Sequence, residues 1–247
     1  AGDFDLIHNN YDFLPLTYSR LIDTPILTTI HGFSSDAIRR VYREYRDSHF
    51  VSISDSDRDP ELPYLATVYN GIDLSNVTVG NGSGDALLFL GRIHPDKGTH
   101  LAIEVAKRAE RRLIIAGIVQ DRVYFEQEVE PHIDHEHVQY IGPVNPRQRD
   151  AIFKQAVAVL HLNTIPERFG LVMAEANGAG VPVIAMDLGS CREVIGDGET
   201  GFLVNGVEEA VAAVGKVGGI DPKACRRRVE EKFSVETMVR GYEAVYG

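Results

Sequence analysis

Tryptophan is absent from this chain, and cysteine occurs only twice, at Cys191 and Cys225. The absence of tryptophan argues weakly against a flat aromatic platform for binding carbohydrate. Two cysteines so far apart in the sequence exclude a disulfide framework and suit a reducing compartment. We therefore expect a cytoplasmic protein.

Long apolar runs and an excess of basic residues are also missing. No stretch approaches the roughly 20 apolar residues of a membrane span, and the start, AGDFDLIHNN, does not resemble a signal peptide. The chain has 25 Lys and Arg against 36 Asp and Glu, a formal net charge of −11. Such a field repels nucleic acid, so we expect no nucleic-acid partner, and any polyanionic ligand needs a local basic pocket.

Apolar runs rich in Val, Ile and Leu alternate with amphipathic helical patterns over about residues 84–230. We expect strands at 86–91, 111–117, 138–142, 157–163 and 181–186, and helices at 99–110, 124–133, 146–156 and 170–180. Continuous apolar strands separated by amphipathic helices predict a doubly wound α/β domain with a parallel sheet covered on both faces. Ligands of such sheets bind at the carboxyl ends of the strands. The loops after residues 91, 117 and 163 are therefore the places to look for chemistry.

The first 80 residues contain fewer elements. We expect parallel strands at 3–10, 25–32 and 49–54, a helix at 37–47, and a weaker fourth strand at 66–73. That is too few elements for a closed α/β domain. The segment GNGSGD, residues 80–85, precedes a strand, whereas a dinucleotide fingerprint follows one, so we interpret it as a linker or hairpin.

The segment GRIHPDKG, residues 91–98, follows the first strand of the second domain. Pro-Asp-x-Gly sequences commonly make type I turns, and such a turn alone would account for it. However, Arg92 and Lys97 flank this loop at the end of a buried strand, where two cations can clamp a diphosphate. In an acidic protein this local positive charge favours the binding interpretation.

The segment ERFGLVMAE, residues 167–175, holds two glutamates, Glu167 and Glu175, around the start of a short helix. The usual interpretation of a glutamate is a solvated residue or a complement to a helix N-terminus. This helix, however, lies between two strands that should be buried, so its carboxylates must find partners or face a cleft. The backbone N–H groups of Phe169, Gly170 and Leu171 could bind phosphate at the helix N-terminus.

Three other features have weaker interpretations. His31, after the strand LTTI, is either structural or catalytic. Three histidines, His132, His135 and His137, lie close together in the sequence. A metal site there is not favoured, because no Cys or carboxylate set completes a recognisable ligand spacing. Four arginines recur along one helix and form a solvated face or a contact for an anionic acceptor or lipid headgroup; they are Arg39, Arg40, Arg43 and Arg46.

In their order and spacing, these segments resemble the retaining GT-B glycosyltransferases of family 4, the glycosyl transferases group 1. The resemblance runs from DFDLIH and PILTTIHG through GRIHPDKG and ERFGLVMAE to the closing FSVETMVRGYEAVYG. It implies two Rossmann-like doubly wound parallel-sheet domains. The implied division is a partial acceptor-side domain at 1–79, a donor-binding domain at 80–234, and a helix at 235–247 that crosses back to the first domain.

The resemblance also implies an activity, a retaining transfer of a hexose from a nucleotide diphosphate sugar, UDP-, GDP- or other, to an acceptor hydroxyl. Neither a metal nor a further cofactor is implied. Glu167 and His31 would lie at the donor sugar and carry the catalytic roles, with Phe169 and Gly170 beside them. The diphosphate would be bound by Arg92, Lys97, Gly170 and Leu171. Glu175 would accept hydrogen bonds from the ribose.

Members of the family normally have further strands and helices before the point that matches residue 1. We therefore expect an incomplete first domain with an unpaired sheet edge, completed by a companion chain or by self-association. An alternative function is a nucleotide-sugar-binding subunit or shortened form with little activity unless complemented. A weaker alternative is a nucleotide-sugar epimerase or a phosphorylase, although no motif supports the pyridoxal phosphate lysine that a phosphorylase needs.

Overall fold

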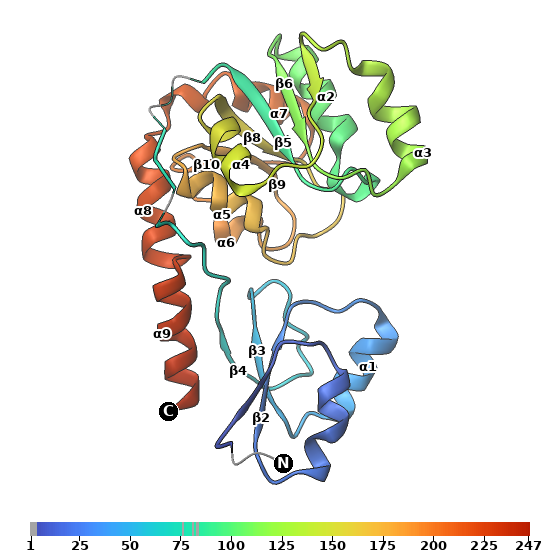
Figure 1. Cartoon of the computed structure of the whole chain (residues 1–247), viewed down its shortest axis with the longest axis vertical. Helices are drawn as coiled ribbons and strands as arrows, with labels where there is room; N and C mark the ends of the chain where they lie inside the picture. Colours follow the sequence, from blue (N-terminus) through green and yellow to red (C-terminus); the bar gives the residue numbers. More distant parts are fainter. Residues whose placement is uncertain (1–3, 76, 81, 83) are drawn as a thin grey trace.

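The computed structural model describes residues 4–75, 77–80, 82 and 84–247 of the chain. Two parallel sheets lie one above the other, and a long helical segment at the end of the chain runs along one side of both (Figure 1). Residue 3 of the first expected strand and residues 81 and 83 of the expected linker lie outside the described residues. The arrangement of two parallel sheets with their helices agrees with the expected α/β fold class.

The first sheet has four parallel strands in the order β1-β2-β3-β4. They are β1 (Ile7–Asn9), β2 (Ile26–Ile30), β3 (His49–Ser52) and β4 (Tyr64–Thr67). The 3-10 helix η1 (Leu14–Leu21) connects the first two strands, and α1 (Asp36–Glu44) connects β2 to β3. The three strands that we expected are present.

The fourth strand was expected at 66–73 but occupies Tyr64–Thr67, so its predicted bounds were wrong. The reason is a long-range contact. Beyond Val68 the chain leaves the sheet, and the backbone N–H of Ile72 donates to the carbonyl of Phe233 at 2.7 Å. Ile72 also forms a parallel bridge with Ser234. Periodicity does not reveal a partner so distant in sequence.

The second sheet has six parallel strands in the order β10-β9-β8-β5-β6-β7. They are β5 (Ala86–Leu90), β6 (Leu113–Ala116), β7 (Val138–Tyr140), β8 (Ala156–His161), β9 (Val183–Met186) and β10 (Gly201–Val204). We did not expect β10, which is short and begins with glycine. Because β5 lies between β6 and β8, the order reverses there, and ligands of doubly wound sheets bind at this reversal.

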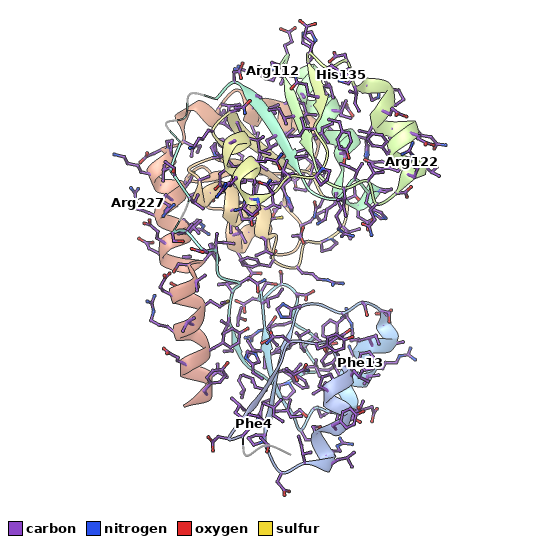
Figure 2. The ribbon with its side chains drawn as sticks, in the orientation of Figure 1. Phe4, Phe13, Arg112, Arg122, His135 and Arg227 are labelled. Carbon is purple, nitrogen blue, oxygen red and sulfur yellow. The ribbon has the colours of Figure 1, made fainter. Side chains whose placement is uncertain are left out.

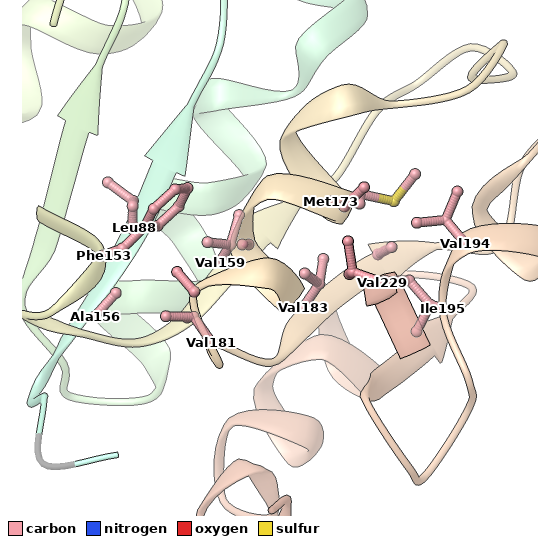
Figure 3. Close-up of a cluster of buried hydrophobic side chains, with 14 of the residues drawn as sticks. Leu88, Phe153, Ala156, Val159, Met173, Val181, Val183, Val194, Ile195 and Val229 are labelled. Atoms are coloured by element: carbon pink, nitrogen blue, oxygen red, sulfur yellow. The ribbon is translucent and has the colours of Figure 1, made fainter. Parts of the chain in front are cut away.

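Helices cover both faces of the second sheet. They are α2 (Thr99–Arg108), α3 (Arg122–Tyr124) with the π-helix η3 (Phe125–Val129) and the 3-10 helix η4 (Glu130–His132), α4 (Pro146–Phe153), α5 (Leu171–Gly178), α6 (Cys191–Val194), α7 (Val207–Val214), the 3-10 helix η5 (Val217–Gly219) and α8 (Pro222–Lys232). Successive strand residues point to opposite faces. Thus Leu88 and Val183 enter the cluster shown in Figure 3, and Leu87 and Ile184 enter the cluster on the other face.

The last helix, α9 (Val235–Tyr246), follows α8 and packs on the first sheet (Figure 1). Met238, Tyr242 and Val245 contact the cluster of Leu27, Val51 and Val68. Ser234 caps the helix by accepting a hydrogen bond from the backbone N–H of Thr237. The division at residues 79 and 234 stays a prediction. Of the helices in the described ranges, none has the length and apolar character needed to cross a membrane.

Candidate functional site

A cavity of about 300 Å³ lies between the two sheets, where side chains of both extend toward each other (Figure 2). Its walls come from the ends of β2, β3, β5 and β8 and from the start of α5. The lining residues used below are His31, Lys97, His161, Asn163, Glu167, Arg168, Phe169, Gly170 and Leu171. The loops after β5 and β8 contribute as expected, whereas the loop after β6 does not line it.

Glu167 accepts several hydrogen bonds in this cavity. Its Oε2 lies 2.7 Å from Nζ of Lys97, 2.6 Å from Nδ2 of Asn163 and 3.1 Å from Nε2 of His161. Its Oε1 accepts the backbone N–H of Arg168 at 3.2 Å. Burial by itself raises the pKa of Glu167, but the hydrogen bond and charge of His161 and the charge of Lys97 outweigh it. The pKa is therefore held well below its usual range, and the side chain is a carboxylate.

The backbone around Glu167 is fixed by two glycines. Glu167 bridges Gly189, and the N–H of Ser190 donates to the Glu167 carbonyl at 2.9 Å. Gly189 has φ +62°, and a Cβ there would lie 2.2 Å from that carbonyl oxygen, so only glycine fits. Gly170, at φ +78°, begins α5, and the first turn of that helix lines the cavity with N–H groups that have no partner within the helix.

The structure separates the two cations expected at the diphosphate. Lys97 ends the 3-10 turn η2 (Pro95–Lys97) and lines the cavity, with a side chain 19% exposed. Arg92 is exposed, is not part of the cavity wall, and donates from Nη1 to Oε1 of Gln120. Lys97 therefore lies where a ligand of the cavity would meet it, while Arg92 would have to turn away from Gln120.

His31 reaches the cavity from the first sheet. It directly follows β2, and its Nε2 lies 3.0 Å from Oδ1 of Asn10. Burial lowers the pKa of His31, which favours the neutral imidazole. The structure thus brings His31 and Glu167 to one cavity from opposite sheets.

Glu175 lies outside the cavity wall, further along α5. Its Oε1 accepts a hydrogen bond from Nη1 of Arg149, on α4, at 2.6 Å. Burial raises the pKa of Glu175, the charge of Arg149 opposes this rise, and the charge of Asp150 adds to it. The glutamates at 167 and 175 therefore occupy different surroundings.

Sequence reasoning missed four polar residues: His161, Asn163 and Arg168, which line the cavity, and Glu193, which lies outside its wall and joins the two sheets. Two of them could have been found from the sequence. His161 ends β8 and Asn163 lies two positions further, so their side chains should point to the same side. The other two cross between the sheets. Arg168 donates from Nη2 to the carbonyl of Phe33 at 2.6 Å and passes over Gly32, where a Cβ would meet its side chain. No local pattern identifies such a partner.

Glu193 makes the second crossing contact. Its carboxylate accepts the backbone N–H groups of Asp55 at 2.8 Å and Ser56 at 2.9 Å, and the hydroxyl of Tyr69 at 2.9 Å. Because Glu193 lies on α6, directly after the Gly189 turn that supports Glu167, the contact joins the backbone beside Glu167 to the end of β3.

The histidine segment lies elsewhere, since His135 is at the end of the molecule distant from the first sheet (Figure 2). His132 contacts Lys107, and His137 contacts Asp134. Within the described ranges, no three His, Cys, Asp or Glu side chains are grouped to hold a metal ion.

Two of the α1 arginines have internal partners. Arg39 and Arg43 lie 3.7 Å and 2.9 Å from Oδ2 of Asp59, whose side chain is fully buried. Arg40 and Arg46 are exposed. This run therefore stabilises the first sheet on one side and meets solvent on the other.

Comparison with known proteins identifies the family. The profile described as "Glycosyl transferases group 1" matches residues 75–222. An uncharacterised 41.2 kDa protein in the cps region of Klebsiella pneumoniae is 35% identical over 167 residues, 65% of this chain and 45% of that protein. The phosphatidyl-myo-inositol mannosyltransferase of Mycobacterium leprae is 26% identical over 238 residues, covering 86% of this chain and 63% of that enzyme. The chain thus spans about half to two thirds of the length of these relatives.

Solved structures show the same fold. HepE of Anabaena, in complex with UDP and glucose, superimposes with a TM-score of 0.84 at 19% identity, over 98% of this chain and 78% of that protein. Sucrose-phosphate synthase of Thermosynechococcus elongatus gives 0.83 at 19% identity, over 98% and 73%. The architecture is therefore that of the GT-B glycosyltransferases, and with the profile match over more than half its length, the chain belongs to the glycosyl transferases group 1.

Proposed function

We propose that the protein transfers a hexose from a nucleotide diphosphate sugar to an acceptor hydroxyl, with retention of the anomeric configuration and without a metal ion. The observation that carries this proposal is the Glu167 carboxylate, 14% exposed and held by Lys97, His161 and Asn163 beside the first turn of α5. In this proposal the carboxylate accepts hydrogen bonds from sugar hydroxyls, and the N–H groups of the helix start donate to the diphosphate.

Charge develops on the diphosphate as the bond to the sugar breaks. Lys97 uses one contact on Glu167, and an ammonium group has three N–H donors, so it can serve both the carboxylate and a phosphate oxygen. The N–H groups of Gly170 and Leu171 add donors at the helix N-terminus. Arg92 joins them once it exchanges Gln120 for the diphosphate. Together these groups stabilise the negative charge of the leaving diphosphate, a role for which other enzymes use a metal.

Retention follows a same-face substitution in this proposal, with Glu167 as a positioning acceptor rather than a nucleophile. Its low pKa and its several hydrogen bonds make the carboxylate a weak nucleophile. Phe169 lies beside it in the cavity wall, and His31 approaches the sugar from the first sheet. The acceptor hydroxyl attacks the anomeric carbon as the diphosphate leaves, and its proton passes to the departing phosphate oxygen.

A second candidate is a subunit that binds a nucleotide sugar without transferring it. The observation in its favour is the apolar surface of the first region, which includes the exposed side chains of Tyr11, Tyr18 and Leu21. A surface of this kind suits association with another chain. Incubation with radiolabelled UDP-glucose and GDP-mannose, followed by assay of the released diphosphate, separates binding from transfer.

Titration calorimetry with UDP, GDP, ADP and dTDP tests the proposed function. We expect one diphosphate to bind in the presence of EDTA, and Lys97→Met to weaken it by about tenfold or more while the matching nucleoside is much less affected. Lys216→Met, at an exposed lysine on the same domain, is the control and should leave binding unchanged. Binding by none of the four diphosphates to the folded protein would refute the proposal, and equal loss of nucleoside and diphosphate binding would refute the role of Lys97.

A further inference from the structure

Arg149 lies in the middle of α4 and its guanidinium group contacts the neighbouring helix α5. Nη1 donates to Oε1 of Glu175 at 2.6 Å, and the Arg149 side chain is only 24% exposed. An arginine at the surface of a helix normally keeps its guanidinium in water. Here the group is withdrawn from solvent to hold one carboxylate.

The placement leaves polar atoms without partners. Nε of Arg149 and Oδ1 of Asp150 are buried, and neither makes a hydrogen bond to any residue that the structure describes. Nη2 of Arg149 lies 3.6 Å from that Asp150 oxygen. Leaving a buried polar atom unpaired costs about 1–3 kcal/mol. Stability of α4 therefore does not account for the position of this arginine.

The contact engages one oxygen of Glu175. Arg149 does not form the two-point fork that guanidinium and carboxylate groups often adopt. Oε2 of Glu175 makes no hydrogen bond within the described part of the chain, so it can accept one from a hydroxyl group. The Glu175 carboxylate therefore has a fixed orientation, and its Oε2 is available to accept a hydrogen bond.

The charged groups near Glu175 come from two packed helices. Arg149 and Asp150 face it from α4, and their charges act on it in opposite directions. From α8, which packs against α5, Arg226 donates to the carbonyl of Gly178 at 3.0 Å rather than to Glu175. Among the described residues, Arg149 is therefore the cation that compensates the partly buried charge of Glu175.

We propose that Arg149 is a positioning residue, which aims the free oxygen of Glu175 at a ribose hydroxyl and keeps this carboxylate ionised. The inference rests on the proposed function and on the ribose contact that the family resemblance implies for Glu175. A hydrogen bond to a charged acceptor is roughly twice as strong as one to a neutral acceptor. Loss of Arg149 should thus weaken recognition of the ribose while the diphosphate contacts remain.

The experiment compares the native protein with Arg149→Met and Arg149→Lys, using the ribose and 2′-deoxyribose forms of UDP, GDP and ADP. In the native protein we expect a preference for ribose of about tenfold, from one hydrogen bond to a charged group. Arg149→Met should lose most of this preference, and its affinity should fall more steeply from about pH 8 to about pH 5.5, because Glu175 protonates more readily. Arg149→Lys should restore the pH profile.

Arg147→Met is the matched control, since Arg147 is an exposed arginine on the same helix and the charge change is identical. It should leave the ribose preference and the pH profile unchanged. A folded Arg149→Met variant that keeps both properties would overturn the role of Arg149 alone. Failure of the native protein to bind any of the diphosphates would instead overturn the proposed function, and this inference with it.

Discussion

The two sheets end at the same cavity but are held together in different ways. The second sheet, β5 to β10, lies between two large apolar clusters, one on each face. The first sheet, β1 to β4, has two small clusters, and one of them depends on α9 from the end of the chain. It also relies on polar contacts, such as Asp59 with Arg43 and Asp12 with Tyr42. Its stability is therefore coupled to the second region.

This contrast extends to the site. The second region presents Glu167 and Lys97 on a backbone fixed by the Gly189 turn and by buried strands. The first region supplies His31, and it is joined across the cavity by Arg168 and Glu193. In the proposed function, a rigid second region and a more weakly held first region suit a reaction in which the two regions close after the donor binds.

The largest expected effect is at Glu167. Glu167→Gln leaves the partly buried Lys97 ammonium without its carboxylate, and removing one partner of a pair withdrawn from solvent costs about 3 kcal/mol. Transfer should fall by about a hundredfold or more, since a fixed polar group at the reacting sugar is lost. Denaturant unfolding and initial rates measure the two effects. The control is Glu208→Gln, which removes a surface partner of Arg108 at a side chain 78% exposed and should leave the stability nearly unchanged.

Comparison of Glu167→Gln with the native protein also tests how stability depends on pH. The folded-state pKa of Glu167 is lowered, so its contribution to stability is present above the unfolded value of 4.5 and is lost as pH falls toward the folded-state pKa. Between about pH 5 and about pH 3, the native protein should lose more stability than Glu167→Gln does. Parallel acid curves for the two proteins would contradict the lowered pKa.

Next in size is the Gly189 turn. Gly189→Ala places a Cβ against the Glu167 backbone in addition to straining a left-handed residue, whereas Gly198→Ala meets open space at φ +76°. We expect the second change to cost about 1–2 kcal/mol and the first at least twice as much. Thermal unfolding measures both. Equal costs would show that the turn gives way without disturbing Glu167.

A smaller effect should follow from Glu193→Ala, which removes the acceptor for the N–H groups of Asp55 and Ser56 and for Tyr69. The expected loss is about 1–3 kcal/mol. Amide hydrogen exchange should accelerate in β3 and β4 and stay unchanged in β8, because the second sheet does not depend on this contact. Acceleration in both sheets alike would remove the distinction between the two regions. Glu44→Ala, exposed at the end of α1, is the control.

The smallest effect on stability should come from the apolar surface of η1. Tyr18 and Leu21 are 57% and 76% exposed, so Tyr18→Ser with Leu21→Ser should change the free energy of unfolding by less than about 0.5 kcal/mol for each residue. The pair should nevertheless reduce self-association in sedimentation experiments, because it removes exposed apolar area from the first region. If the double variant self-associates as the native protein does, the η1 surface is not the site of self-association.

Several elements of the fold could be predicted because their signals are local. Buried strands such as β5 and β8 appear as apolar runs, and the start of α5 is marked by the glycine at 170. The bounds of β4 could not be predicted, because they depend on pairing near Phe233. At the site, Glu167 and Lys97 were found separately, but nothing in their spacing showed that they form an ion pair.

The sequence by itself determined the alternation of strands and helices, the family motifs, and the residue types available at the ends of the strands, since these depend on neighbours within a few positions. Tertiary structure alone decided which of those residues meet. In the folded protein Lys97 donates a hydrogen bond to Glu167, Arg92 donates to Gln120, and Arg149 donates to Glu175. Such pairings depend on the order of strands in the sheet and on the packing of helices, which bring together side chains separated by many residues of sequence.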